Sequence, residues 1–255
     1  DGRGYTVEVL GPVVERDAQG RARLRKIGGY GETKNGHSVL LRLQYGNFRV
    51  LFGGDLNEKA EKFLLTHYAG IDKFPKRGSQ AYKDMIADAS KTFRADIMKV
   101  CHHGSEKVTD AFLATVNPAA FILSSGDAEG HVHPRPDLLG RLGRFGRGDA
   151  PVLLSTELQR STRELEDQDA VDDLKSDIAR LSQAPTAELL ADVQERVQAL
   201  ARTNVSVYGA IYLKTDGERL ITAFRIETGS QTKKWFYFEY ALDEEGELRL
   251  AGGGQ

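Results

Sequence analysis

Residues 38–55 read SVLLRLQYGNFRVLFGGD and hold the pattern that decides the fold. Two apolar runs flank the dipeptide Gly46-Asn47, an arrangement that predicts a β-hairpin with a tight turn. The two glycines that follow allow the backbone to bend, so that Asp55 comes just after the second strand. Because α/β proteins place their sites where strands meet loops, we expect the Asp55 carboxylate to belong to a site.

Strands and helices alternate on either side of this hairpin. Tyr5–Leu10 alternates apolar and polar residues before Gly11-Pro12, which predicts a strand. Residues 13–36 are polar and contain glycines without sustained periodicity, and we expect a long loop there. The alternation as a whole predicts an α/β domain. Similar patterns predict strands over 96–101 and 119–123, and helices over 57–68, from Ser105 onward and over 136–145.

Residues 157–202 differ from the rest, because apolar residues recur at helical intervals on both sides of Pro185. Proline is tolerated near a helix start but not inside a helix, so this pattern predicts two helices that form a hairpin. Residues 157–177 hold eight Asp or Glu against three Lys or Arg, which favours a lid or a protein-docking surface. Strands near Val207, Leu220 and Trp235 close the chain, and we expect residues 252–255 to be frayed.

The composition is that of an ordinary globular protein. The 255 residues are 40% apolar and 28% charged, and no run approaches the roughly 20 apolar residues that a membrane helix requires. A single cysteine, Cys101, and a start unlike a signal peptide predict a cytoplasmic protein with no membrane partner. The net charge is −2, so any binding of nucleic acid must depend on a local basic patch.

Histidines gather at the predicted strand ends. Four of the six form the pairs His102-His103 and His131-x-His133, and His37 comes just before the hairpin. Imidazole and carboxylate ligands suit zinc or manganese, and a carboxylate such as that of Asp55 can bridge two ions. The order and spacing of these residues therefore predict a metal site.

The series of motifs resembles the metallo-β-lactamase domain that ends the competence protein ComEC. That family shows an N-S-x-V-L strand, a T-G-D turn, H-H-G-S, N-P and a G-H-P-H-P segment in this order. The resemblance covers residues 5–156 and resumes at 208–211. It implies the second half of a four-layer αβ/βα sandwich, built from residues 1–156 and 203–255 with a helical hairpin inserted over 157–202. The matching segments are 35–43 (NGHSVLLRL), 52–56 (FGGDL), 98–105 (MKVCHHGS), 117–118 (NP), 124–126 (SSG) and 130–134 (GHVHP).

The resemblance also implies the metal ligands. Asp55 takes the place of the carboxylate that bridges two divalent ions, zinc or manganese. One of His102 and His103 takes the place of a late histidine ligand. His37 occupies the position where many relatives keep a further histidine ligand.

Other residues are assigned to the substrate in the same way. His131 or His133 would donate a hydrogen bond to a phosphoryl oxygen or protonate the leaving oxygen. Backbone amides at the helix expected from Ser105 would hold another phosphate oxygen, and Arg135 would contact phosphate. The implied activity is metal-dependent hydrolysis of phosphodiesters by a nuclease, with DNA as the favoured nucleic-acid substrate.

One element of the family pattern is absent: no H-x-H-x-D-H loop, the source of most ligands, occurs in the 255 residues. We therefore expect an N-terminal half of the same fold, as a fragment or a separate chain, to complete the site. Because the chain begins at Asp1, we also expect processing of a longer polypeptide by an activating protease. In that case the acidic hairpin over 157–202 would serve as a gate across Arg141 and Arg144.

Other interpretations stay open at this stage. The same fold also supports hydrolysis of a small thioester or lactam, and a third possibility is a regulatory or scaffold module without metals. At the level of single residues, Asp55 could cap the helix near Asn57, and one imidazole of His102-His103 could be structural. Arg135, Arg141, Arg144 and Arg147 could form a phosphate-binding stripe or a solvated helix face.

Overall fold

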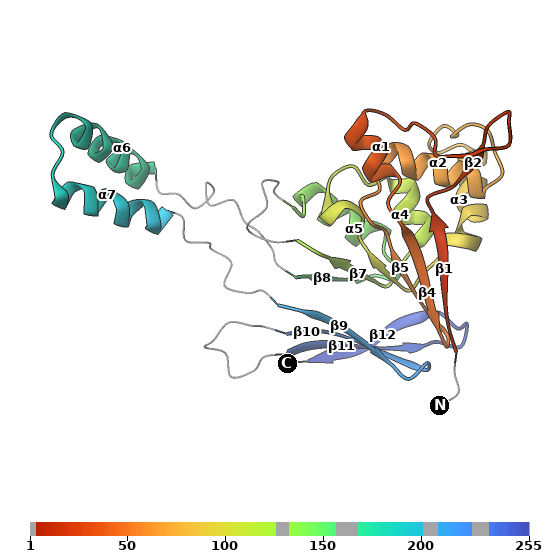
Figure 1. Cartoon of the computed structure of the whole chain (residues 1–255). Coiled ribbons are helices and arrows are strands. Elements are labelled where there is room, and N and C mark those ends of the chain that lie inside the picture. The colour runs from red at the N-terminus through yellow and green to blue at the C-terminus, as the bar shows by residue number, and fades with distance from the viewer. Residues whose placement is uncertain (1–3, 126–132, 157–167, 201–208, 226–234, 255) are drawn as a thin grey trace.

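The computed structural model describes residues 4–125, 133–156, 168–200, 209–225 and 235–254. This part of the chain is a mixed α/β structure in which a central six-stranded sheet lies between a layer of helices and a four-stranded sheet (Figure 1). A helical hairpin forms a further unit. Within these ranges, no helix combines the length and the apolar character that crossing a membrane requires.

The six-stranded sheet consists, in spatial order, of β1 (Tyr5–Gly11), β4 (Leu40–Tyr45), β5 (Phe48–Phe52), β6 (Ile97–Lys99), β7 (Ala120–Leu123) and β8 (Val152–Ser155). β1, β4 and β5 pair antiparallel, whereas β5 to β8 are parallel. The carboxyl ends of parallel strands share one edge of a sheet. The segments that follow β5, β6 and β7 therefore lie side by side, and these segments contain Asp55, His102 and Ser124.

Helices cover one face of this sheet: α1 (Tyr30–Gly36), α2 (Glu58–Tyr68), α3 (Gln80–Phe93), α4 (Asp110–Val116) and α5 (Pro136–Phe145). α2 begins after Asn57, whose side chain accepts a hydrogen bond from the Ala60 amide at 3.2 Å, a normal N-cap. The apolar sides of the helices pack on Leu51, Met98 and Phe121, which are completely buried.

The four-stranded sheet packs on the opposite face and has the order β12 (Leu248–Gly254), β11 (Trp235–Leu242), β10 (Arg219–Arg225) and β9 (Ile211–Thr215). Leu220 and Tyr240 from this sheet share a buried core with Phe48, Val50 and Ile97 from the central sheet. The predicted strands over 203–255 therefore exist, and they form a second sheet rather than an extension of the first.

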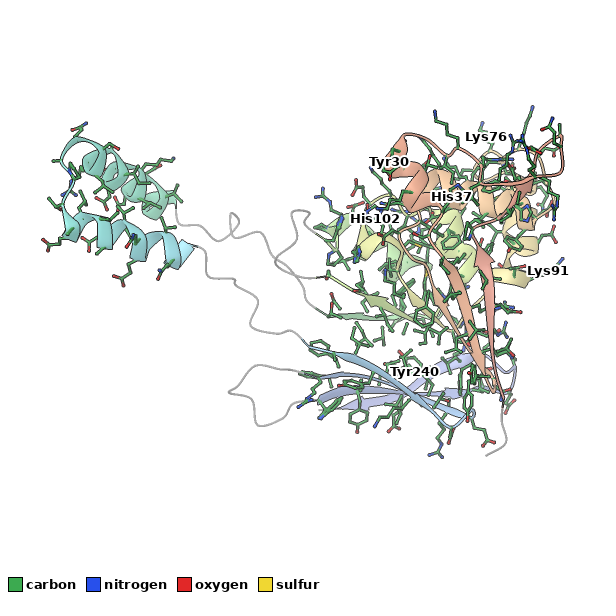
Figure 2. The ribbon with its side chains drawn as sticks, viewed as in Figure 1. Tyr30, His37, Lys76, Lys91, His102 and Tyr240 are labelled. Atoms are coloured by element: carbon green, nitrogen blue, oxygen red, sulfur yellow. The ribbon has the colours of Figure 1, made fainter. Side chains whose placement is uncertain are left out.

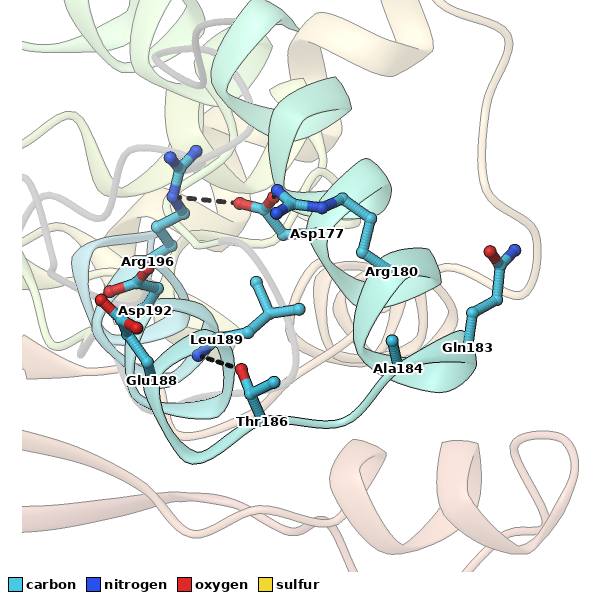
Figure 3. A pocket seen from close by; sticks show the side chains of 9 residues that line it. All are labelled: Asp177, Arg180, Gln183, Ala184, Thr186, Glu188, Leu189, Asp192 and Arg196. Carbon is cyan, nitrogen blue, oxygen red and sulfur yellow. Dashed lines mark hydrogen bonds and ion pairs between the residues drawn. The ribbon is translucent and has the colours of Figure 1, made fainter.

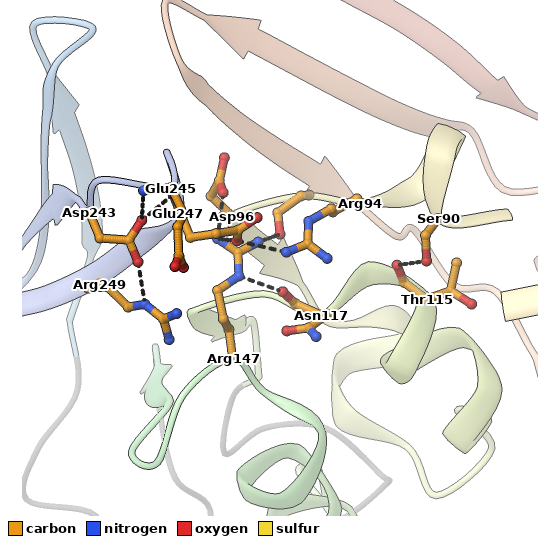
Figure 4. Close-up of polar contacts among 11 residues, drawn as sticks. Ser90, Arg94, Asp96, Thr115, Asn117, Arg147, Asp243, Glu245, Glu247 and Arg249 are labelled. Carbon is orange, nitrogen blue, oxygen red and sulfur yellow. Dashed lines mark hydrogen bonds and ion pairs between the residues drawn. The ribbon is translucent and has the colours of Figure 1, made fainter. Parts of the chain in front are cut away.

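Four charged residues, which we call the Asp96 cluster, join the two sheets at the amino end of β6: Arg94, Asp96, Arg147 and Glu247 (Figure 4). The Arg147 guanidinium is 2.9 Å from the Asp96 carboxylate and 3.2 Å from that of Glu247. It also donates to the carbonyls of Asn117 and Ala95. All of these groups have partners, so the Asp96 cluster is a structural junction.

The predicted helical hairpin consists of α6 (Gln168–Gln183) and α7 (Ala187–Leu200). Leu174 and Val193 are its buried apolar residues. Asp177 lines a pocket between the helices, and its carboxylate pairs with Arg180 at 3.0 Å and with Arg196 at 3.4 Å (Figure 3). The segments that join the hairpin to the sheets lie outside the described residues.

Three local expectations are wrong. Residues 13–36 are not all loop: they contain the short strands β2 (Glu15–Arg16) and β3 (Ala22–Arg23) as well as α1, whose start is fixed by Glu32 bonding the Gly29 amide. The helix expected from Ser105 begins only at Asp110, because the Thr109 hydroxyl caps it. Residues 252–254 are not frayed, since they pair with β11.

Candidate metal centre

The histidine pair lies in a short 3-10 turn, η1 (Cys101–Gly104), directly after β6. Both His102 and His103 have left-handed backbone conformations, with φ of 46° and 54°. Such conformations cost a non-glycine residue about 1–2 kcal/mol each. The turn is nevertheless fixed by a hydrogen bond from the His102 amide to the Gly54 carbonyl at 2.9 Å, which ties it to the segment that carries Asp55.

His103 is oriented as a metal ligand would be. Its Nδ1 is 2.6 Å from the carbonyl oxygen of Ser124, which can only accept, so Nδ1 carries the proton. In the neutral ring Nε2 is then the lone-pair nitrogen, and it lies 3.5 Å from the Asp55 carboxylate. A histidine that donates one ring N–H to a carbonyl and turns the other nitrogen outward is the usual arrangement around a bound metal.

The Asp55 carboxylate is not used to cap a helix. Its backbone amide donates to the Ser38 hydroxyl at 2.9 Å, and Asn57 provides the N-cap of α2. Gly54 has a φ of 56°, and a Cβ there would lie 2.6 Å from the Ser38 side chain, so a glycine is required at this bend. The side chain of Asp55 is therefore held near His103 by the backbone, and its carboxylate makes no structural hydrogen bond to any residue that the structure describes.

His102 and His133 extend the group. Their ring centroids are 6.0 Å apart with nearly perpendicular planes, and the ring of His102 is 6.5 Å from that of His103. Burial lowers the pKa of His102, and the nearby His103, Lys107 and Lys99 lower it further against the effect of Asp55. His102 is therefore neutral at pH 7, and its buried Nδ1 has no hydrogen-bond partner among the described residues. His131, the other histidine of its pair, lies outside the described residues.

The donor set on these residues is partial. No three His, Cys, Asp or Glu side chains of the described residues are positioned together to hold a metal ion. Two donors at about 2.1 Å from one tetrahedral zinc ion lie roughly 3.4 Å apart. The 3.5 Å between His103 Nε2 and Asp55 Oδ1 fits that spacing. The described chain can thus supply two ligands of one ion, with His102 and His133 beside them.

His37 is not shown in this group. Its Nε2 is 2.7 Å from the carbonyl oxygen of Arg25, at the carboxyl end of α1. Within the described residues, no contact joins its ring to Asp55 or to the histidine pair, although its neighbour Ser38 contacts the Asp55 amide. His37 follows the end of α1 as its C-cap, and His102 lies in the turn after β6; both are labelled in Figure 2. The role of His37 as a ligand stays a prediction.

The two predicted substrate residues have different surroundings. Ser105 is buried, and its hydroxyl accepts from the Lys107 amide at 3.3 Å in a local turn, so no helix N-terminus opens there. Arg135 precedes α5, and its side chain is 47% exposed and lies 3.8 Å from Glu106, a loose contact. The backbone amide of Arg135 donates to the Gly104 carbonyl, so its guanidinium starts next to the histidine turn.

The predicted arginine stripe is divided. Arg147 is buried in the Asp96 cluster, and the guanidinium of Arg141 bonds Asp110 and the carbonyls of Glu106 and Val108. These two arginines are engaged in structure and are not a phosphate-binding surface. Arg135 and Arg144 are exposed. Because the guanidinium of Arg141 is already bonded, Arg141 does not belong to the substrate path across which the acidic hairpin was expected to act as a gate.

Two residues near the turn have no counterpart in the predicted site. Lys99 ends β6, and its ammonium is 3.5 Å from the Gly54 carbonyl. Glu61 is completely buried in α2, accepts from the Thr109 amide at 2.6 Å and interacts with the Cys101 thiol. Burial raises the pKa of Glu61 to about 8, so this acid is largely protonated at neutral pH. The signal in the sequence was an acidic residue beside Ala60 and Leu64 on the buried side of α2.

Comparison with known proteins identifies no relative. No family model matches the chain, and no curated protein and no solved structure is significantly similar to it. Function must therefore be inferred from the site itself.

Proposed function

We propose that this chain contributes Asp55 and His103 to the metal centre of a phosphodiester hydrolase with two divalent ions, zinc or manganese. The fold would be the second half of a four-layer metallo-β-lactamase sandwich, and the favoured substrate is DNA. The observation that carries the proposal is the orientation of His103. Its Nδ1 is bound to the Ser124 carbonyl, and its Nε2 faces the Asp55 carboxylate at a distance suited to one shared ion.

The remaining ligands would come from another segment, and one surface suits its docking. On β1, the edge strand of the central sheet, the side chains of Tyr5, Val7 and Val9 are 72%, 49% and 67% exposed. Their neighbours on β4 lie on the same face of the central sheet. The four-stranded sheet covers this face at β5 and β6, where it buries Val50 and Ile97. An N-terminal half that extends this covering layer would bury the apolar strip and bring its ligands to the carboxyl edge.

The chemistry expected of this centre divides among few residues. When bound, divalent ions lower the pKa of a coordinated water and neutralise charge that develops on the phosphoryl group. Asp55 and His103 would hold them, and the Ser124 carbonyl keeps the His103 ring in the required tautomer. His133, beside His102, would donate to a phosphoryl or leaving oxygen, and the exposed Arg135 would hold a neighbouring phosphate.

Calorimetric titration with zinc or manganese tests the proposal on this chain directly. Wild-type protein should bind metal, whereas Asp55→Ala and His103→Ala should lose most of that binding, because each removes one of two donors. His67→Ala is the matched control, since that histidine lies on α2 and contacts Phe63 and Tyr68. If both variants bind metal as the wild type does, the site assignment is wrong.

The class of reaction needs the complete site. In protein supplied with the missing ligands, bis(p-nitrophenyl) phosphate and single-stranded DNA should be cleaved with metal, and a thioester or a lactam should not. Faster hydrolysis of the thioester or lactam would replace the phosphodiester proposal with that of a small-molecule hydrolase. Metal binding without any hydrolysis would favour a scaffold role.

A further inference from the structure

Lys99 carries a positive charge that forms no ion pair with the residues that the structure describes. It is the last residue of β6, on the sheet face shared with Ile97, and its neighbours in register are Phe52 and Ile122. Its side chain is partly buried, yet no carboxylate lies within ion-pair distance of its ammonium among the described residues. A partly buried ammonium without a counter-charge is costly, which makes an anion from outside the described chain a favourable partner.

The ammonium is directed to the carboxyl edge of the sheet. Within the described ranges its one hydrogen bond goes to the Gly54 carbonyl at 3.5 Å, a long contact that leaves other N–H donors without a partner there. Gly54 precedes Asp55, and the same carbonyl accepts from the His102 amide at 2.9 Å.

We infer that Lys99 binds an anionic oxygen of the substrate, a phosphate oxygen, at the edge of the Asp55–His103 centre. The inference rests on the proposed function and deepens it by naming a substrate contact between strand and metal centre. An ammonium there would hold the phosphoryl group against the edge of the sheet, while Arg135 approaches from the start of α5. Lys99 is thereby assigned to substrate binding, and the metal ligands are left unchanged.

Two separate titrations test this assignment, one with inorganic phosphate in metal-free buffer and one with zinc in phosphate-free buffer. Lys99→Met should weaken phosphate binding by about ten- to a hundredfold, the usual worth of a hydrogen bond to a charged group, and leave zinc binding unchanged. Lys99→Arg should recover most phosphate binding, because it restores the charge. Lys91→Met is the matched control, since this lysine pairs with Asp88 on α3.

The outcomes separate this inference from the proposed function. If wild-type protein binds no phosphate, or if Lys99→Met binds it as tightly as the wild type, the role of Lys99 is overturned. A melting temperature measured for each variant shows whether Lys99→Met is folded, and a folded variant that loses both phosphate and zinc also contradicts the assignment. Phosphate binding through Lys99 in a protein that binds no zinc would overturn the metal centre alone.

Discussion

The two ends of strand β6 carry polar groups of opposite kinds. At its amino end, the Asp96 cluster pairs each charge with another group: Asp96 accepts from the Arg49 amide and from Arg147, and Glu247 accepts from Arg94. At its carboxyl end lies the group formed by Asp55, Lys99, His102 and His103, which we call the His103 cluster. Among the described residues, this cluster has donors and acceptors without hydrogen-bond partners.

The difference is the one that the proposed function requires. Buried polar groups in folded proteins are nearly always satisfied, so a satisfied cluster needs no explanation beyond stability. The His103 cluster combines left-handed backbone at two histidines with a ring nitrogen on His102 that has no partner in the described part of the chain, and both features cost free energy. Such costs are expected where a ligand, and not the fold, completes the arrangement.

The largest expected effect comes from breaking the Asp96 cluster. Arg147→Ala should lower the free energy of unfolding by about 3–5 kcal/mol, because it leaves the Asp96 carboxylate buried without its partner. The side chain of Arg147 is only 6% exposed and bonds four groups, so water cannot replace it. Urea unfolding at pH 7 measures the change. Arg144→Ala, at an exposed arginine near Phe145, should cost less than about 0.5 kcal/mol.

The next effect depends on pH and concerns Glu61. This acid is buried, and its Oε1 has no hydrogen-bond partner among the described residues. Its pKa is raised by burial from 4.5 to about 8, so the folded protein keeps a proton that the unfolded chain releases. Stability should therefore fall as pH rises through this window and level off above it.

Glu61→Gln should remove this loss. The amide keeps an acceptor for the Thr109 N–H and cannot ionise, so we expect the variant to be more stable than wild type at pH 8.5 by a few kcal/mol and similar at pH 5. Thermal unfolding across pH 5–9 measures the difference. Equal slopes for the two proteins would show that Glu61 is ionised in the folded state.

Much of this fold could be predicted from the sequence. The hairpin over 38–52, the helices starting after Asn57 and at Pro136, and the helical pair around Pro185 all follow from local periodicity and turn residues. α1 could not, because its few turns are stabilised by contacts of Thr33 and Glu32 and not by an apolar stripe. Nor could the full length of β12, because its run of glycines has a low preference for strands even though its partner β11 lies just before it in the chain.

The residue types of the candidate site could be predicted from the sequence, but the contacts of the individual side chains could not. Spacing places Asp55 and the histidine pair at neighbouring strand ends, as the structure does. The proposal of His103 over His102 as a ligand required coordinates, because it rests on the contact of His103 Nδ1 with the Ser124 carbonyl. The functions of the arginines also depend on tertiary partners, since Arg147 and Arg135 have the same chemistry but entirely different burial.

A smaller effect on stability is expected at low pH, and it concerns Glu247 in the Asp96 cluster. Burial opposes ionisation of Glu247, but the hydrogen bond from Arg94 and the charge of Arg147 outweigh it, so the pKa of Glu247 lies below its usual value. This carboxylate stabilises the fold above pH 4.5 and ceases to do so as pH falls through its lowered pKa. Glu247→Gln should cost about 1 kcal/mol at pH 7 and much less near pH 2.5, measured by urea unfolding. Glu245→Gln, a substitution on the same turn, is the matched control.

The smallest effect on stability is expected at the His103 cluster, and it is the most informative. Asp55→Ala should change the free energy of unfolding in a chelating buffer by less than about 0.5 kcal/mol, because its structural hydrogen bond to Ser38 comes from the backbone amide and survives the substitution. With zinc at a hundred times its dissociation constant, wild-type protein should gain about 2.7 kcal/mol while the variant gains almost nothing. Urea unfolding with and without zinc, with His67→Ala as the control, measures both values. A loss for Asp55→Ala in the chelating buffer as large as that for Arg147→Ala would place Asp55 among the structural charges, and the two ends of β6 would then no longer differ in kind.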